Sequence, residues 1–269
     1  MNSTWYRYPS EQSILWATLS IVLVVIIITA TATFCGSAVF ILLAVGYAFL
    51  ITRSHHQSLI QNALPVTPQT LPELYRLVDE CAHRLGVSGF HVYVTRSSQL
   101  NAYTFGLSNP KVVVLYSPLL EIMDRDELAF IIGHELGHIR LGHTWLNSLV
   151  GGMAGIPSSG FVSVMLMFAF LSWNRACEYS ADRAGILANG NPNKAITALI
   201  KLVAGPAGLT ERGLAAAYQQ IDAEDDTWLG NLSEAFASHP LLIRRIDQLK
   251  KFAHTSAYMN FTRQGTLTH

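Results

Sequence analysis

The chain has 269 residues, with 18 Lys and Arg against 18 Asp and Glu, so its formal net charge is zero. Only 13% of the residues are charged and 50% are hydrophobic, whereas about 25% of a soluble protein is charged. This composition excludes an ordinary soluble globule, a disordered chain and a nucleic-acid-binding protein with a basic surface. The three cysteines are too few and too scattered for a disulfide framework or a CxxC pair.

The first long apolar segment covers residues 12–52, which contain no charged side chain. One helical crossing of a bilayer needs about 20 apolar residues, so this segment has the length of two. A low-propensity patch at residues 33–37 lies midway and favours a turn. We therefore predict a transmembrane hairpin of two helices over residues 1–52, with one long tilted helix or a signal anchor as alternatives. A cleaved secretory signal does not fit, because its apolar core is shorter and follows several positive charges.

Residues 53–69 are polar, contain two prolines and predict a linker. Thr70 and Glu73 then form a T-x-x-E capping box, which predicts a helix that runs to Gly86. Three strand-like runs follow and predict a small sheet: Phe90–Thr95, Asn101–Phe105 and Val112–Tyr116.

Two helix starts come next in the sequence. Ser117-Pro118 predicts a short helix, and Asp124 with Glu127 forms a capping box for a longer one. The remaining third of the chain predicts further helices at Asn193–Val203, Glu211–Ile221 and Leu241–Phe252. The fold class is therefore mainly α with a small β-sheet, an α+β domain that follows a transmembrane hairpin.

The longer helix contains the pentapeptide His-Glu-Leu-Gly-His, an H-E-x-x-H motif, at residues 134–138. Four residues advance a helix by about 400°, so His134 and His138 lie on one face, one turn apart, and can hold one zinc ion. Glu135 lies beside that face and can act as general base on a zinc-activated water. The apolar residues that precede the motif indicate a buried helix, where such a cluster without a metal is costly.

A catalytic zinc site has three protein ligands, so a third ligand is required. His143 is nearest, but five residues of helix turn it about 140° away from His138, so we interpret it as structural or as a helix-end residue. Glu178 and Asp182 share a helix face and form the first charged cluster after the second apolar stretch. We predict that Glu178 binds the metal and that Asp182 orients a ligand histidine.

These motifs together resemble the HtpX-like and type I CAAX-prenyl endopeptidase family of membrane zinc proteases, which are of the gluzincin type. The strings that carry the resemblance are GHELGH, E-x-x-x-D-x-x-G from Glu178 to Gly185, and Ser-His-Pro at 238–240 followed by Arg245. Asn101-Ala102-Tyr103-Thr104-Phe105-Gly106 is similar to the edge strand of that family. The resemblance runs from about residue 70 to residue 253.

The resemblance implies roles for residues outside the metal motif. His239, held by Pro240, is a candidate oxyanion donor, and a plain surface histidine is the alternative. Arg245 either assists His239 or pairs with an acidic residue such as Asp182. An extended substrate can add to the strand that begins Asn101, Ala102, Tyr103 as a further β-strand.

A second uncharged stretch, residues 144–174, resembles a membrane span in composition. A single crossing is excluded if His138 and Glu178 bind one ion, and two full spans need about 40 residues. Glycines between positions 151 and 160 favour a turn. We predict an apolar helical hairpin that either packs within the catalytic domain or enters the near leaflet.

The predicted protein is a membrane-anchored zinc metalloendopeptidase with one Zn²⁺, acting on membrane or misfolded proteins. Its metalloprotease domain spans residues 70–254, and residues 255–269 form a tail. Arg7 and Arg53 flank the hairpin, which favours a bacterial-type inner (plasma) membrane with the catalytic domain on the cytoplasmic side. The expected partners are protein or peptide substrates and the lipid bilayer, with no nucleic acid. The alternatives are a catalytically silent scaffold or chaperone and a processing enzyme for lipidated carboxyl termini.

Overall fold

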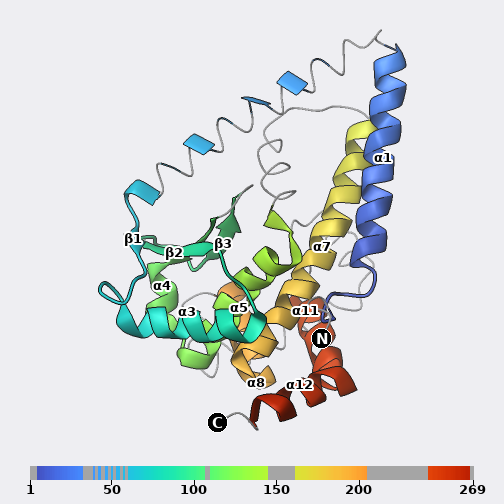
Figure 1. The fold of residues 1–269 in the computed structure, drawn as a ribbon. Coiled ribbons are helices and arrows are strands. Elements are labelled where there is room, and N and C mark those ends of the chain that lie inside the picture. The colour runs from blue at the N-terminus through green and yellow to red at the C-terminus, as the bar shows by residue number, and fades with distance from the viewer. Residues whose placement is uncertain are drawn as a thin grey trace.

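The computed structural model describes residues 5–32, 60–106, 110–144, 161–204 and 242–266, together with scattered positions between 39 and 57. Helices dominate these ranges, and the described strands form one small sheet at the side of the helical body (Figure 1). The predicted class, mainly α with a small sheet, is confirmed. The predicted helix at 211–221 lies outside the described residues.

The sheet is mixed and has the strand order β1-β2-β4-β3. Strand β2 is parallel to β4, whereas β1 and β3 run antiparallel to their neighbours. The bounds are β1 (Leu64–Pro65), β2 (Phe90–Thr95), β3 (Ala102–Phe105) and β4 (Lys111–Tyr116). β4 is mostly buried because its alternate side chains pack into two hydrophobic clusters, Val113 and Leu115 into one and Val112 and Val114 into the other. β1 and β3 lie at the two edges of the sheet.

The helices of the body surround one continuous hydrophobic core. The helix α5 lies at its centre and packs against α3, α7, α8 and the strands β3 and β4, and most of its residues are buried. The bounds are α3 (Pro72–Leu85), α4 (Ser117–Ile122), α5 (Arg125–Leu141), α7 (Phe161–Asn189), α8 (Pro192–Ala204), α11 (Leu242–Ala253) and α12 (Ser256–Thr266).

The closest helix pair of the body is α5 with α7, because small residues face each other along the contact. A Cβ atom built on Gly133 would lie 2.3 Å from the Cβ of Ala188, and one on Gly137 would lie 2.5 Å from the Cβ of Ala184. Neither helix has room for a larger side chain at these points. This contact brings the α7 residues near Glu178 within reach of the α5 histidines.

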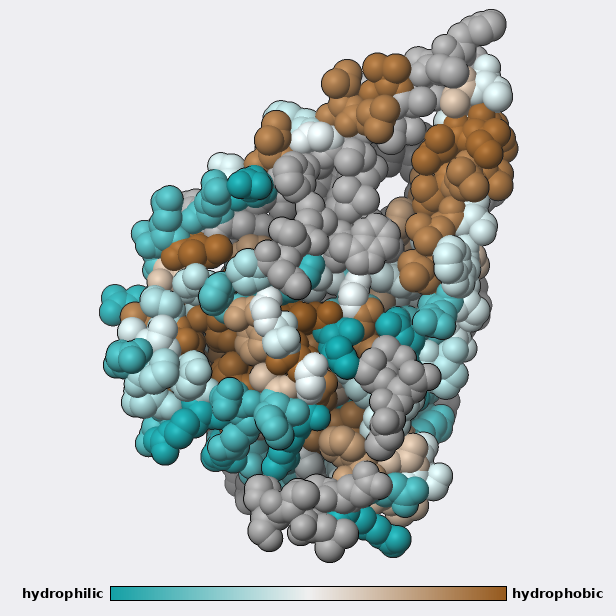
Figure 2. Space-filling model, viewed as in Figure 1, coloured by the Kyte–Doolittle hydropathy of each residue, from teal (hydrophilic) through white to brown (hydrophobic). Residues whose placement is uncertain are grey.

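One described helix, α1 (Glu11–Ala32), is long and apolar enough to cross a membrane by length and composition. Its large side chains, among them Trp16, Leu23 and Ile28, are exposed. Figure 2 shows this hydrophobic surface over α1, away from the hydrophilic lower part of the molecule. The first arm of the predicted hairpin is therefore present as a helix. The predicted turn lies outside the described residues, and the second arm is described only at scattered positions, so the hairpin stays a prediction.

The apolar first half of α7 lies alongside α1 (Figure 1). The Thr18 hydroxyl donates a hydrogen bond of 3.1 Å to the carbonyl of Ala169, and Trp173 packs against Ile14 and Leu15. The second arm of the apolar stretch 144–174 is therefore the start of the same helix that carries Glu178. Residues 145–160, where the turn was predicted, lie outside the described residues.

Three sequence predictions about segment ends differ from the structure. Leu64 and Pro65, inside the predicted linker, pair with β2, a contact too short to leave a strand pattern. The predicted tail contains α12, whose Tyr258 is buried in the core. The helix predicted to begin at the Thr70 capping box begins instead at Pro72, because the Thr70 hydroxyl bonds to the carbonyl of Pro65 in the preceding turn.

Candidate metal centre

The helix α5 positions both histidines and the glutamate of the H-E-x-x-H motif. It begins at the predicted capping box, in which Asp124 accepts hydrogen bonds from the backbone of Asp126 and Glu127. His134, Glu135 and His138 are all buried. The predicted helix start is therefore confirmed, and the motif faces the interior.

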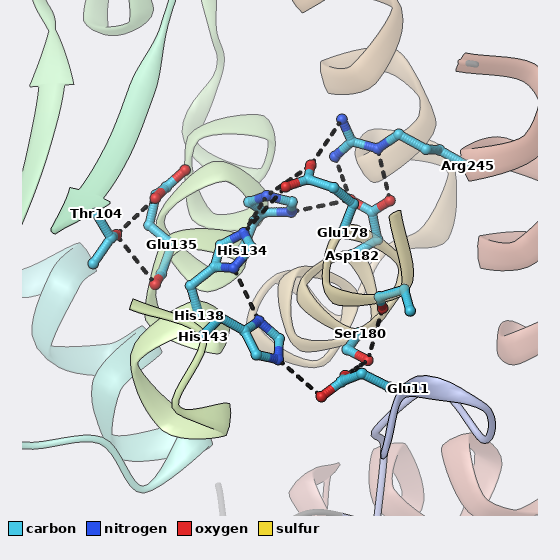
Figure 3. A network of polar contacts seen from close by, with 11 residues as sticks. Glu11, Thr104, His134, Glu135, His138, His143, Glu178, Ser180, Asp182 and Arg245 are labelled. Atoms are coloured by element: carbon cyan, nitrogen blue, oxygen red, sulfur yellow. Dashed lines mark hydrogen bonds and ion pairs between the residues drawn. The ribbon is translucent and has the colours of Figure 1, made fainter. Parts of the chain in front are cut away.

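His134, His138 and Glu178 converge on one point (Figure 3). The Nε2 atoms of the two histidines are 3.2 Å apart. The Glu178 carboxylate lies 3.7 Å from His134 Nε2 and 3.5 Å from His138 Nε2. Two donor atoms that bind the same tetrahedral zinc ion, each about 2.0–2.1 Å from it, lie about 3.3 Å from each other. The spacing and the chemistry of this donor set therefore fit a zinc ion.

Asp182 sets the orientation of the His134 ring. Its Oδ1 atom lies 3.0 Å from His134 Nδ1, so a carboxylate there requires the proton on Nδ1 and leaves the Nε2 lone pair toward the centre. Arg245, on α11, donates to both Asp182 oxygens, from Nε at 2.8 Å and from Nη2 at 2.6 Å. Arg245 Nη1 also lies 3.6 Å from Glu178, so the guanidinium joins the two carboxylates.

His143 occupies the corresponding position behind the His138 ring. The helix ends at Leu141, and Gly142 adopts a left-handed conformation with φ of 78°, so the chain turns back on itself. His143 Nδ1 then lies 3.0 Å from His138 Nδ1. His143 is therefore a buried residue just after the helix end, in agreement with its interpretation from the sequence, but its contact with His138 was not expected because the angle of 140° assumed a continuing helix.

Burial and charge shift the pKa values of the groups behind the ligands. Burial disfavours the charged form of Asp182, but the charge and hydrogen bonds of Arg245 outweigh it and lower the pKa. Burial lowers the pKa of His143 to about 4 despite its hydrogen bond to Glu11. Burial opposes protonation of His138 as well, but Glu178 outweighs it and raises the pKa. Asp182 is therefore ionised and His143 neutral at pH 7.

A pocket of about 400 Å³ opens over the centre. The edge strand β3 forms one wall, with Ala102, Tyr103 and Thr104, and Asn101 precedes it. The opposite walls are apolar and include Phe130, Leu202 and Leu242. An extended peptide that lies along β3 would pass over the three candidate ligands.

Thr104 contacts the predicted general base directly. Its hydroxyl donates a hydrogen bond of 2.7 Å to Oε2 of Glu135 (Figure 3). β3 thus fixes the position of the Glu135 carboxylate through this hydrogen bond.

The structure brings the predicted residues together with one exception. His134, Glu135, His138, Glu178, Asp182 and Arg245 form one cluster, and the strand from Asn101 to Tyr103 lines the same pocket. His239 lies outside the described residues, so its role stays a prediction. The sequence left open whether Arg245 assists His239 or pairs with Asp182, and in the structure its hydrogen bonds go to Asp182.

Two residues of the cluster were not expected from the sequence, Thr104 and Glu11, and neither was the contact of His143 with His138. Thr104 was noted only as part of the strand motif, and Glu11 only as the last charge before the apolar segment. The sequence contains no signal that joins Glu11 to His143, because 132 residues separate them.

Comparisons with known proteins agree with this site. The model of Peptidase family M48 matches residues 68–253. The Plastoglobule-localized metallopeptidase 48, chloroplastic, of Arabidopsis thaliana is 26% identical over 82% of this chain and 69% of that protein. A Protease HtpX homolog of Ralstonia nicotianae is 28% identical over 73% of this chain and 79% of that protein.

A solved structure shares the fold. The crystal structure of S. mikatae Ste24p matches 90% of this chain and 63% of its own length, with a TM-score of 0.50 and 20% identity. The family match covers more than half of the chain and includes the whole candidate centre on α5 and α7. The resemblance that the sequence motifs indicated is therefore confirmed, and the chain belongs to peptidase family M48.

Proposed function

We propose that the protein is a membrane-anchored zinc metalloendopeptidase that hydrolyses peptide bonds of membrane or misfolded proteins. One observation carries the proposal: two imidazoles and a carboxylate converge within 3.2–3.7 Å of one another beside the buried Glu135, under an open pocket. Membership of a peptidase family supports the same class of reaction.

His134, His138 and Glu178 would hold the metal. A zinc ion in this position supplies a Lewis acid that polarises the scissile carbonyl and acidifies water. Glu135 takes a proton from the attacking water and delivers it to the leaving amine. Thr104 keeps that carboxylate at one side of the pocket through its hydrogen bond of 2.7 Å.

The substrate is proposed to bind as an extended strand. β3 is the edge strand that lines the pocket, and main-chain hydrogen bonds to such an edge place a peptide with little demand on its side chains. His239 is the proposed oxyanion donor, and Arg245 holds the two carboxylates on α7. Protein substrates of varied sequence suit this arrangement.

The membrane location rests on the exposed apolar surface of α1. A helix of 22 residues with few buried side chains finds an apolar environment in a bilayer. We propose an integral membrane protein of the bacterial inner-membrane type with the catalytic domain on the cytoplasmic side.

The test compares Glu135→Gln with wild-type protein in detergent, with zinc content and cleavage of an unfolded protein measured on the same samples. We expect Glu135→Gln to retain zinc and to lose cleavage by a factor of about 10²–10⁴. Glu178→Ala should lose the metal itself. Glu121→Gln, the same change at an exposed position on α4, is the control and should behave as wild type.

Cleavage that survives in Glu135→Gln and resists a chelator would contradict the mechanism. A wild-type protein that binds zinc but cleaves nothing would favour the silent scaffold.

A further inference from the structure

Glu11 is the first residue of the apolar helix α1, and its side chain is only 1% exposed. A buried carboxylate is costly unless charged and hydrogen-bonding groups surround it. Here Arg7 forms an ion pair with Oε1, and the Ser180 hydroxyl donates to Oε2. The Arg7 guanidinium also donates to the carbonyl of Leu141, at the end of α5, with a distance of 2.9 Å. The start of α1 is therefore fastened to both α5 and α7.

Glu11 also accepts a hydrogen bond from a residue that contacts the candidate centre. His143 Nε2 lies 3.1 Å from Glu11 Oε1, and His143 Nδ1 lies 3.0 Å from His138 Nδ1 (Figure 3). The carboxylate, the two rings and the centre thus form one continuous chain of contacts. None of these three side chains is more than about one-tenth exposed.

The hydrogen bonds between Glu11, His143 and His138 require one particular placement of the protons on the two rings. A carboxylate accepts, so His143 carries its proton on Nε2 and presents an acceptor at Nδ1. His138 then donates from Nδ1 and keeps its Nε2 lone pair toward His134 and Glu178. Both nitrogens of His143 are used in this arrangement, Nε2 as donor to Glu11 and Nδ1 as acceptor from His138.

We propose that Glu11 is a positioning residue of the metal centre, which acts through His143 to hold the ring and the tautomer of His138. The proposal rests on the proposed role of His138 as a metal ligand. It makes the start of the membrane helix a structural part of the centre. Partners of this kind behind a ligand typically change metal affinity by about 10–100-fold.

A second metal ion is the competing explanation of the same cluster, because Glu11, His143 and Cys177 present atoms within 4.8 Å of one another. The hydrogen bonds already use both nitrogens of His143 and the carboxylate. We therefore assign the cluster to positioning.

The experiment measures the zinc dissociation constant of the full-length protein in detergent by competition with a chromogenic chelator. Glu11→Leu removes the acceptor, and we expect zinc to bind about 10–100-fold more weakly. The visible spectrum of the cobalt-substituted protein should change as well, because the His138 ring is no longer held. A purely structural role of Glu11 would leave both readouts unchanged in folded protein.

A pair of variants at His143 tests the direction of the hydrogen bonds. The amide of Gln can accept from His138 and donate to Glu11, so His143→Gln should retain zinc affinity within about threefold. His143→Leu can do neither and should bind zinc as weakly as Glu11→Leu. If Glu11→Leu does not fold, the comparison of His143→Gln with His143→Leu still tests the proposal.

Thr18→Val is the control for general loosening between α1 and α7. It removes the hydrogen bond from Thr18 to Ala169 but lies outside the chain of contacts, so its zinc affinity should equal wild type. Equal losses in Thr18→Val and Glu11→Leu would overturn the proposal. So would unchanged zinc affinity in both Glu11→Leu and His143→Leu.

Two further outcomes distinguish the positioning role of Glu11 from a second metal site and from a failure of the proposed function. A second zinc ion per wild-type chain that disappears in Cys177→Ser would identify a second metal site and overturn the positioning role. Wild-type protein that binds no zinc, or binds it as well after His134→Ala, would instead contradict the proposed function itself.

Discussion

The two candidate ligand histidines are held from behind in different ways. His134 is held by Asp182, and Asp182 is paired with Arg245, so this support lies entirely within the catalytic domain. His138 is held by His143, which bonds to Glu11 at the start of the apolar helix. One candidate ligand is therefore supported from within the domain and the other from the start of the apolar helix α1.

This difference has a physical consequence for the enzyme. The Asp182 support is an ion pair between α7 and α11, and it stays intact as long as those helices stay packed. The Glu11 support depends on where α1 begins relative to α5 and α7. A displacement of α1 would thus act directly on the support of His138, whereas the support of His134 has no direct contact with Glu11. Variants that remove one support at a time can measure this asymmetry.

The largest expected effect is the loss of the buried ion pair that supports His134. Arg245→Met leaves the Asp182 carboxylate buried without its guanidinium, which costs about 3–5 kcal/mol of stability at neutral pH. Thermal unfolding of the metal-free protein in detergent measures this effect. Arg125→Met, which breaks an exposed ion pair with Glu80, is the matched control and should change stability by less than about 1 kcal/mol.

The pH dependence of the stability loss in Arg245→Met shows whether it comes from lost charge pairing or from lost packing. In wild-type protein the pKa of Asp182 is below its ordinary value, so its contribution to stability is present above about pH 4 and is lost on further acidification. Without Arg245, burial raises that pKa, and the protonated side chain needs no guanidinium. The stability gap between wild type and Arg245→Met should therefore narrow as the pH falls toward 4. A gap of constant size would show that packing, not charge, is lost.

A substitution at the contact between α5 and α7 should cause a smaller loss of stability. It should also disturb the supports of both histidines together. In Gly133→Ala the new Cβ would overlap Ala188, which separates the helices and costs about 1–3 kcal/mol. Because Glu178, Ser180 and Asp182 all lie on α7, zinc affinity should fall together with stability. Unfolding temperature and zinc content measure the two effects.

The reciprocal change provides the control for Gly133→Ala. Ala188→Gly removes the methyl group 2.3 Å from the new Cβ, but the Cα atom of Gly185 would still lie 3.1 Å from it, so the double variant should recover part of the zinc affinity. A double variant as weak as Gly133→Ala would show that the remaining contact with the α7 backbone, and not the Ala188 methyl group, causes the loss.

The parts of the centre encoded by local sequence signals could be predicted. The capping box at Asp124 and the spacing of His134 and His138 depend on one helix, and helical periodicity alone puts both rings on one face. The carboxylates on α7 follow the same rule. The three predicted strands of the sheet also match the structure, because each has a run of β-forming residues.

The parts that depend on tertiary contacts could not be predicted. The contact between Glu11 and His143 joins the two ends of a long loop of chain, and the sequence alone does not reveal it. The position of His143 depends on the left-handed Gly142, which ends the helix two residues before His143, whereas the angle of 140° assumed a helix that continues. The Thr70 capping box is a local signal as well, but a competing turn uses its hydroxyl. Local patterns therefore predict candidate ligands, whereas their supports require the structure.

The smallest effect on stability is expected at Thr104, which contacts neither histidine support. Thr104→Val removes the hydrogen bond to Glu135 and keeps the size of the side chain. We expect kcat to fall about tenfold, since a hydrogen bond to a charged group contributes about 1.5–3 kcal/mol and part of this orients the base. Zinc affinity should stay within about twofold of wild type. Steady-state cleavage and chelator competition measure the two quantities.

Thr104→Ser separates orientation from strand packing, because it keeps the hydroxyl and loses only a methyl group. Its kcat should lie close to wild type, whereas a tenfold loss in both variants would assign the effect to the strand. If Thr104→Val instead weakens zinc binding as much as Glu11→Leu, then Glu135 and the ligands move as one unit. In that case the separate supports of His134 and His138 would not be independent, and the asymmetry between domain and membrane segment would disappear.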